Sequence, residues 1–313
     1  MKPNPTENKL LNDSRLLILS DGKPGHVNQS IAFARHLGCE YDLVPVRFKR
    51  RLYKGLSYLA DRFGYYSTNL FNAERLSQRY AAVVSAGSET YYANRTLARQ
   101  LGCKAIAIML PQGYRLDFDL IVAQQHDEPP QRKNILSLPI NLTYLEPLGL
   151  VTPEPDNHYV ALIIGGDSGR QKMDVALLQK QLEKVRGLFP RHKLWMTTSR
   201  RTPAEVEKML RRYHFDQAIY YSENPTNPIP DFLQHSEYVF MTADSSSMIS
   251  EAVSFGTSCV EVLPLSGRDS GNNKFSRFIN GLIGMNCLHL FDGELGHASE
   301  KIKLTELFAG VCL

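Results

Sequence analysis

The segment from Tyr238 to Pro264, YVFMTADSSSMISEAVSFGTSCVEVLP, constrains the fold more than any other part of the chain. It opens with a short apolar run of β-forming residues, passes through a serine-rich loop that favours a helix N-cap, and closes with a second apolar run. This order predicts strand, loop, helix and strand, with the helix from about Ser247 to Phe255 and Gly256 just beyond it. Such a unit is typical of a parallel sheet covered by helices.

The serine-rich loop also indicates a binding site. A helix N-terminus presents free backbone N–H groups and a partial positive charge of about +0.5, which suits a phosphate. The segment from Asp244 to Ser247 stands at this point, and Glu251 follows about a turn and a half into the helix. A carboxylate there can accept hydrogen bonds from a ribose diol beside the phosphate. An ordinary strand–helix unit with a capped helix has the same spacing, so the pattern leaves both interpretations open.

The rest of the chain repeats this alternation of buried strands and helices. Pro129 to Asp156 is proline-rich with little periodicity, and we take it as the crossing between two domains. The fold class is therefore α/β, with two Rossmann-like, doubly wound parallel-sheet domains at residues 1–150 and 151–313. Further strands are expected at 16–19, 42–46, 81–85, 104–109, 120–123, 159–164, 194–197 and 218–221.

A glycine-containing loop follows the first strand. Its sequence, SDGKPGH, precedes a helix expected from about Asn28 to Leu37, and it places Asp21, Lys23 and His26 on a tight turn. The spacing matches neither of the two common nucleotide-binding glycine motifs. A histidine beside a carboxylate on such a turn could act as a general base, which makes His26 a candidate. The alternative is a solvated loop histidine.

Residues 47–62 form a basic amphipathic segment that contains no acid before Asp61. One interpretation is a helix that lies on an anionic membrane surface or holds an anionic acceptor. The other is a solvated helix whose leucines face the core. The cations are Arg47, Lys49, Arg50, Arg51 and Lys54, and the apolar residues at helical spacing are Leu52, Leu56, Leu59 and Phe63.

Composition excludes several classes of protein. Of the 313 residues 43% are hydrophobic and 22% charged, which is normal for a globular protein with a large core. The five cysteines are scattered without C-x-x-C spacing, so neither a disulfide framework nor a zinc site is suggested. A net charge of +4 does not by itself indicate nucleic acid. The polar N-terminus is no signal peptide and no apolar run of about 18 residues occurs, so we expect a cytoplasmic protein.

These motifs together resemble the ELM1/GtrOC1 family of glycosyltransferases, also called mitochondrial fission ELM1-like, within the GT-B superfamily. The resemblance covers nearly the whole chain and implies two Rossmann-like domains that face each other across a cleft. The matching stretches are SDGKPGHVNQS (Ser20–Ser30), GGDS (Gly165–Ser168), TADSSSMISEA (Thr242–Ala252), and Lys274-Phe275 with the helix after it.

The resemblance implies roles for individual residues. By similarity to the lipid-intermediate N-acetylglucosaminyltransferases, His26 is the catalytic base, with Asp21 as the alternative base, in which case His26 would bind the acceptor. The donor diphosphate would lie at the second-domain loops and Glu251 would hold the ribose. The donor set is Gly165, Gly166, Asp167, Ser168, Thr198, Arg200, Asp244, Ser245, Ser246, Ser247, Glu251 and Lys274. The acceptor-side set is Gly22, Lys23, Gly25, Asn28, Gln29, Gly87 and Ser88.

The function implied is transfer of a sugar from a nucleotide-sugar, with UDP-sugar the expected donor, to a cell-envelope or lipopolysaccharide-type acceptor. No cofactor or metal is expected, because helix N-termini with Arg200, Arg201 or Lys274 can neutralise a leaving diphosphate. No D-x-D pair stands where a metal-using transferase would need one. Expected partners are the donor, a glycan or lipid-linked acceptor, and anionic membrane contacted through residues 47–62 at the inner face of the cytoplasmic membrane. The alternatives are a nucleotide-sugar 2-epimerase and a non-catalytic adaptor.

Overall fold

The computed structural model describes residues 15–74, 79–167, 172–265 and 273–311. It divides into two compact units, one running to Tyr144 and resuming at Leu304, and the other spanning Leu145–Lys303. The expected division at 150/151 is close to this boundary, whereas the chain from Leu304 returns to the first unit instead of staying with the second. No helix in the described ranges is both long and apolar enough to cross a bilayer.

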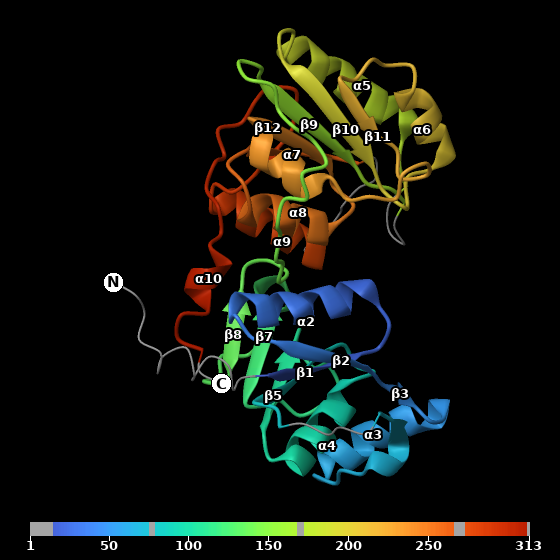
Figure 1. Cartoon of the computed structure of the whole chain (residues 1–313), viewed down its shortest axis with the longest axis vertical. Helices are drawn as coiled ribbons and strands as arrows, with labels where there is room; N and C mark the ends of the chain where they lie inside the picture. Colours follow the sequence, from blue (N-terminus) through green and yellow to red (C-terminus); the bar gives the residue numbers. More distant parts are fainter. Residues whose placement is uncertain (1–14, 75–78, 168–171, 266–272, 312–313) are drawn as a thin grey trace. The chain divides into compact units, whose positions relative to one another are not determined.

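The first unit is built on a six-stranded parallel sheet with the strand order β2-β1-β5-β6-β7-β8 (Figure 1). Its central strands are apolar on both faces because helices cover both, and Leu16 to Leu19 are at most 2% exposed. Helix α2 covers one face and α4 the other. The strands are β1 (Leu16–Ser20), β2 (Tyr41–Pro45), β5 (Ala82–Ala86), β6 (Lys104–Ile108), β7 (Leu120–Gln124) and β8 (Ile135–Leu138), and the helices are α2 (Pro24–His36), α3 (Arg51–Arg62), α4 (Tyr91–Leu101) and α10 (Leu304–Leu307).

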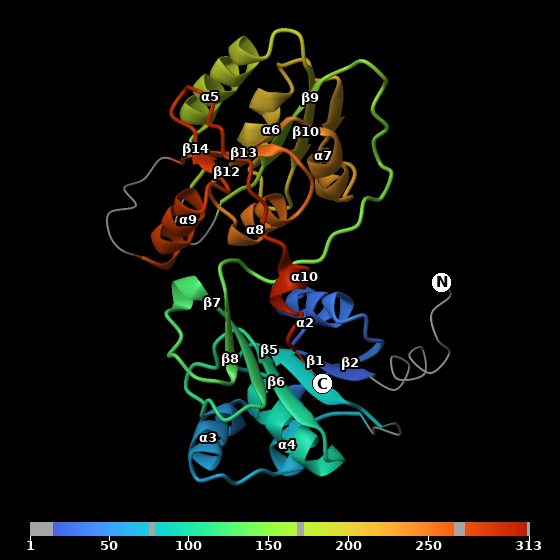
Figure 2. The same ribbon diagram turned by 90° about the vertical axis from the view of Figure 1, so that its left-hand side faces the viewer.

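Several smaller elements complete the first unit. A short antiparallel pair, β3 (Arg47–Phe48) and β4 (Phe71–Asn72), precedes and follows α3, and single 3₁₀ turns occur at Thr68–Leu70 and Gln125–Asp127. The C-terminal segment packs on α2, where the Phe308 ring meets the Phe33 ring edge-on at 5.6 Å between centroids. Figure 2 shows α10 beside α2. This contact accounts for the return of the chain to the first unit.

The second unit also has a six-stranded parallel sheet, with the order β11-β10-β9-β12-β13-β14. Helices α5 and α6 pack their apolar side chains on one face of β9 and β10. On the other face, the Trp195 ring stacks on Phe232 of α7 at 5.4 Å. The strands are β9 (Tyr159–Ile164), β10 (Lys193–Thr198), β11 (Gln217–Ile219), β12 (Tyr238–Thr242), β13 (Cys259–Leu263) and β14 (His289–Leu290), and the helices are α5 (Val175–Leu188), α6 (Ala204–Leu210), α7 (Ile229–His235), α8 (Ser246–Ser254) and α9 (Lys274–Gly284).

One local prediction was wrong, and another was right only in part. Helix α2 begins at Pro24 rather than near Asn28, because proline fits the first helical position, where its missing N–H costs nothing. His26 therefore lies in the first turn of a helix instead of on a loop. The crossing expected at 129–156 does contain the boundary between the two units, after Tyr144, but it also contains strand β8. This is a four-residue edge strand whose alternation is too weak to identify it in the sequence.

Candidate functional site

Both glycine loops lie at the point of their sheet where the strand order reverses. In the first unit β1 lies between β2 and β5, and in the second β9 lies between β10 and β12. In open parallel sheets, ligands bind outside the carboxyl ends of the strands at such a point. The loops after β1 and β5 therefore form one candidate site, and those after β9 and β12 form another.

In the first unit, the centre of the site is a pair formed by Asp21 and His26. The Asp21 side chain is 2% exposed, and its Oδ2 lies 2.8 Å from His26 Nδ1. With the carboxylate as acceptor, Nδ1 is the donor, and the lone pair of the imidazole lies on Nε2. His26 is 22% exposed, and its Nε2 makes no hydrogen bond to the described residues. This arrangement orients a histidine as a base towards a ligand.

Gly87, at the end of β5, makes room for this pair. A Cβ atom built there would lie 2.4 Å from both Cε1 and Nδ1 of His26, and its φ of +89° also favours glycine. The Asp21 carboxylate is fixed further because its Oδ1 accepts a hydrogen bond from the Lys23 backbone N–H at 3.0 Å. The Lys23 ammonium lies 3.5 Å from Oδ2. The residues that hold the pair thus come from both loops at the reversal point.

The remaining acceptor-side residues divide into two groups. Gly22, Lys23, Gly25 and Asn28 are exposed around the start of α2. Gln29 is buried and its side-chain oxygen accepts a hydrogen bond from Gln124 at 3.1 Å, so it joins α2 to β7. The Ser88 carbonyl accepts from the Tyr114 hydroxyl at 3.1 Å. Gln29 and Ser88 therefore make internal contacts of the unit.

In the second unit, Asp244 ties the two loops together. Its side chain is fully buried, Oδ2 accepts from the Gly166 N–H at 3.1 Å and from Arg201 Nη2 at 2.8 Å, and Oδ1 accepts from Thr242 at 2.7 Å. Burial raises the pKa of this carboxyl, and the Thr242 and Gly166 hydrogen bonds and the Arg201 charge oppose that rise. Asp244 and Arg201 thus form an ion pair across 43 residues, which no sequence pattern indicates.

The two glycines after β9 are needed for close packing. A Cβ at Gly165 would lie 1.9 Å from Asp244 Oδ1, and one at Gly166 would lie 2.0 Å from the Arg201 carbonyl oxygen. The Gly165 N–H donates to Thr242 Oγ1 at 2.8 Å. The Asp167 side chain accepts from the Met173 N–H at 2.9 Å, which shapes the loop instead of facing a ligand.

Helix α8 begins beside these two loops, which Asp244 joins. Ser245 is its N-cap and accepts from the Met248 N–H at 3.4 Å, and Ser246 and Ser247 occupy its first turn. Glu251, one and a half turns on, is partly buried, and its carboxyl forms no hydrogen bond or ion pair with the described residues, whereas its backbone carbonyl accepts from the Ser254 hydroxyl. Burial raises its pKa to about 7. A first turn beside a carboxyl without a partner is an arrangement that suits a phosphate and a neighbouring hydroxyl donor.

The other donor-side predictions are placed as follows. Thr198 is buried, and its hydroxyl donates to Glu207 at 2.9 Å and accepts from the Tyr221 N–H, so its contacts are structural. Arg200 is exposed in the loop after β10, and Lys274 is exposed at the start of α9. Ser168 lies outside the described residues.

At the opposite edge of the second sheet, the structure brings together a group that the sequence did not indicate. His158, His192 and Glu237 directly precede β9, β10 and β12, and their ligand atoms all lie within 4.8 Å of one another. His158 pairs with Glu237, and His192 Nε2 lies 3.1 Å from Glu237 Oε2. These residue types can hold zinc, although their mutual hydrogen bonds account for the arrangement without an ion.

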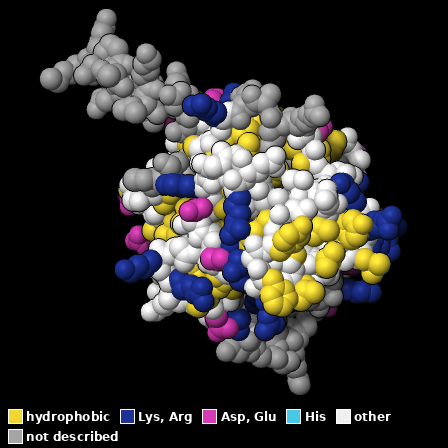
Figure 3. Space-filling model, turned by 90° about the horizontal axis from the view of Figure 1, so that it is seen from below, with side chains coloured by type: hydrophobic (Ala, Val, Ile, Leu, Met, Phe, Trp, Pro, Cys, Tyr) yellow, Lys and Arg dark blue, Asp and Glu magenta, His cyan; other side chains and the backbone are white. Residues whose placement is uncertain are grey.

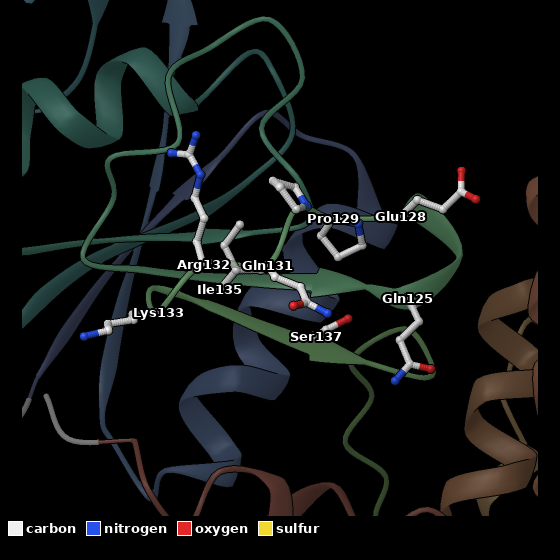
Figure 4. A pocket seen from close by; sticks show the side chains of 9 residues that line it. Gln125, Glu128, Pro129, Gln131, Arg132, Lys133, Ile135 and Ser137 are labelled. Carbon is white, nitrogen blue, oxygen red and sulfur yellow. The ribbon is translucent and has the colours of Figure 1, made fainter.

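A hollow of about 630 Å³ lies on the first unit, apart from the Asp21–His26 pair. Figure 4 shows its lining side chains, which come from the segment after β7 and from the edge strand β8. That strand is three places from β5 in the sheet. None of the predicted site residues lines it.

Two parallel six-stranded sheets with switch-point loops define the GT-B fold. Solved structures agree with this fold over most of their length. The glycotransferase of kitacinnamycin superposes with a TM-score of 0.54 at 13% identity, covering 90% of this chain and 87% of that one. UGT89C1 of Arabidopsis thaliana, complexed with UDP-L-rhamnose, gives 0.51 at 12% identity, covering 96% and 88%.

The chain belongs to the mitochondrial fission ELM1 family, whose model matches residues 24–309. This confirms the resemblance drawn from the sequence motifs. A curated relative, the uncharacterized protein RP120 of Rickettsia prowazekii (strain Madrid E), is 34% identical over 106 residues, which is 31% of this chain and 29% of the relative. The chain thus matches under a third of that relative's length.

Proposed function

We propose that this protein transfers a sugar from a nucleotide-sugar donor to a hydroxyl of a cell-envelope acceptor in the cytoplasm, without a metal ion. The observation that carries the proposal is the difference between its two switch points. One presents an oriented imidazole, and the other presents a helix N-terminus beside an unpartnered carboxyl. Support for a UDP-sugar comes from the fold neighbour from Arabidopsis thaliana, whose structure contains UDP-L-rhamnose.

In the proposed reaction, His26 Nε2 takes the proton from the acceptor hydroxyl while Asp21 stabilises the resulting imidazolium. The acceptor oxygen forms a bond to the anomeric carbon. The bond from that carbon to the diphosphate oxygen breaks, and the nucleoside diphosphate leaves with the electron pair. The first turn of α8, together with Arg200 and Lys274, stabilises the negative charge that develops on the diphosphate. Glu251 accepts hydrogen bonds from the ribose.

The test is thermal shift and calorimetry with UDP, GDP, ADP, TDP and CMP and their sugars. A ligand at about 100 times its Kd adds roughly 2.7 kcal/mol to stability, which raises Tm by on the order of 5 °C. We expect one nucleotide to stand out and Glu251→Ala to weaken its binding without unfolding the protein. No response to any nucleotide would overturn the proposal in favour of an adaptor. Epimer formation from donor alone would favour an epimerase.

A further inference from the structure

Helix α3 turns its leucines outward and buries two polar side chains. Ser57 and Asp61 are 0% and 1% exposed, whereas Leu52 and Leu59 are 82% and 54% exposed. The interpretation in which the leucines face the core was therefore wrong. The outward apolar set, called the α3 face below, consists of Leu52, Leu56, Leu59, Phe63 and Tyr65.

The buried polar side fixes the helix in this orientation. Asp61 accepts from Arg95 at 2.7 Å, from the Tyr66 hydroxyl at 2.7 Å and from the Arg115 N–H at 2.8 Å. Ser57 shares a hydrogen bond with the Tyr114 hydroxyl at 2.8 Å. Rotating the leucines inward would carry Asp61 away from Arg95 and break this buried ion pair, which is strongly unfavourable. The exposure of the α3 face is thus a built feature of the unit.

Cations surround the α3 face. From Arg47 to Tyr66 the single acidic residue is Asp61, and it is buried. Figure 3 shows hydrophobic side chains gathered on this face of the molecule with Lys and Arg beside them. The exposed cations of this segment are Arg47, Lys49, Arg50, Arg51 and Arg62.

We propose that the α3 face binds the surface of an anionic phospholipid bilayer. Its leucines and aromatic rings would enter the boundary between headgroups and acyl chains, and its arginines and lysine would contact lipid phosphates. A second copy of this chain fits less well, because a two-fold contact would place the exposed cations of one copy against the same cations of the other. The proposal stands independently of sugar transfer.

The experiment is vesicle flotation of the full chain with phosphatidylcholine vesicles, with and without about a third phosphatidylglycerol, at low and high salt. We expect binding to the anionic vesicles only, weakened by salt. Leu52→Ser with Leu59→Ser should weaken it about tenfold, and Arg50→Glu with Arg51→Glu by at least about fivefold per residue. The matched controls are Leu188→Ser on α5 and Arg132→Glu with Lys133→Glu, which should bind as the wild type does.

Two results would overturn the proposal. One is wild-type protein that stays with neither kind of vesicle, and the other is a doubly serine-substituted variant that floats as well as the wild type. Thermal melting of each variant shows that it is folded. If light scattering shows a wild-type dimer that the leucine variant loses while no vesicle binds, the α3 face contacts a second copy instead.

Discussion

The two switch-point loops have the same local architecture but opposite use of their side chains. In the first unit, the loop after β1 buries Asp21 and leaves its partner His26 22% exposed, with no hydrogen bond from Nε2 to the described residues. In the second unit, the Asp244 carboxylate in the loop after β12 is fully buried and accepts hydrogen bonds from Gly166, Thr242 and Arg201. Among the described residues, one loop leaves a histidine nitrogen without a hydrogen bond, and the other uses its carboxylate to hold its own backbone.

Under the proposed function, this contrast suits the two units to two different tasks. A proton transfer needs a side chain whose free nitrogen faces the ligand. Anion binding needs rigid backbone N–H groups at a helix start, and these are placed best when the neighbouring side chains are already satisfied. The predictions below test each loop in its own unit.

The largest effect is expected for Gly87→Ala. The added Cβ would displace the His26 ring from Asp21, so the transfer rate should fall about 10²-fold or more while nucleotide binding is unchanged. Gly38→Ala is the control, because Gly38 also has a positive φ, of +64°, but has no atom within 4 Å of the added Cβ. The measurement is kcat together with the ¹⁵N spectrum of the His26 imidazole. Equal rates in the two variants would remove the pair from catalysis.

A moderate effect is expected for Gly165→Ala. The Cβ would collide with the buried Asp244 carboxylate, and overpacking of this kind costs about 1–3 kcal/mol. We expect a lower denaturation midpoint and loss of nucleotide binding. Gly25→Ala, in the first turn of α2 with open space around it, should leave stability unchanged or raise it. A Gly165→Ala protein as stable as the wild type would contradict the interlocked loop.

The smallest effect is a pH dependence carried by Glu251. Its folded-state pKa is about 7 and its ordinary value 4.5, so the folded protein holds the proton more tightly. Wild-type stability should therefore fall as pH rises from about 4.5 to 7 and stay lower above it, whereas Glu251→Gln should not follow this fall.

Nucleotide binding should show the opposite trend, because an ionised carboxylate accepts ribose hydrogen bonds better. Wild-type affinity should rise through pH 7, by about tenfold at most, and Glu251→Gln affinity should stay flat. Melting and calorimetry from pH 5 to 8.5 measure both trends, with Glu205→Gln on the exposed side of α6 as control. Parallel curves for Glu251→Gln and the wild type would place Glu251 outside the site.

Local patterns predicted most of the fold. The apolar runs that form β1, β5, β9 and β12 are each followed by turn-forming residues. An apolar run and a turn signal can each be recognised from neighbouring residues alone. The start of α2 was missed because a proline in a glycine loop favours a turn and a first helical position alike. Strand β8 was missed because its place in the sheet depends on hydrogen bonds to β7, not on a pattern in its own sequence.

The candidate site was less predictable than the fold. Sequence spacing placed Asp21 with His26 because five residues separate them, and a turn at the start of a helix closes that distance. It could not show that Asp244 reaches Arg201, or that Gly87 meets His26, since each contact joins separate strands of the sheet. Gln29, Thr198 and Asp167 have suitable chemistry for binding, but their neighbours in the fold already satisfy them.

By itself the sequence determined two parallel-sheet units, a glycine loop at each switch point, and a family with the motifs to match, because these follow from short-range periodicity and turn chemistry. Only the tertiary structure decided which polar groups remain available. The same is true of α3, whose leucine spacing left open whether these side chains face the core or an outer surface. In the structure Asp61 faces inward and pairs with Arg95, 34 residues away. A buried charge is stable only when it is paired, and keeping this pair leaves the leucines facing outward.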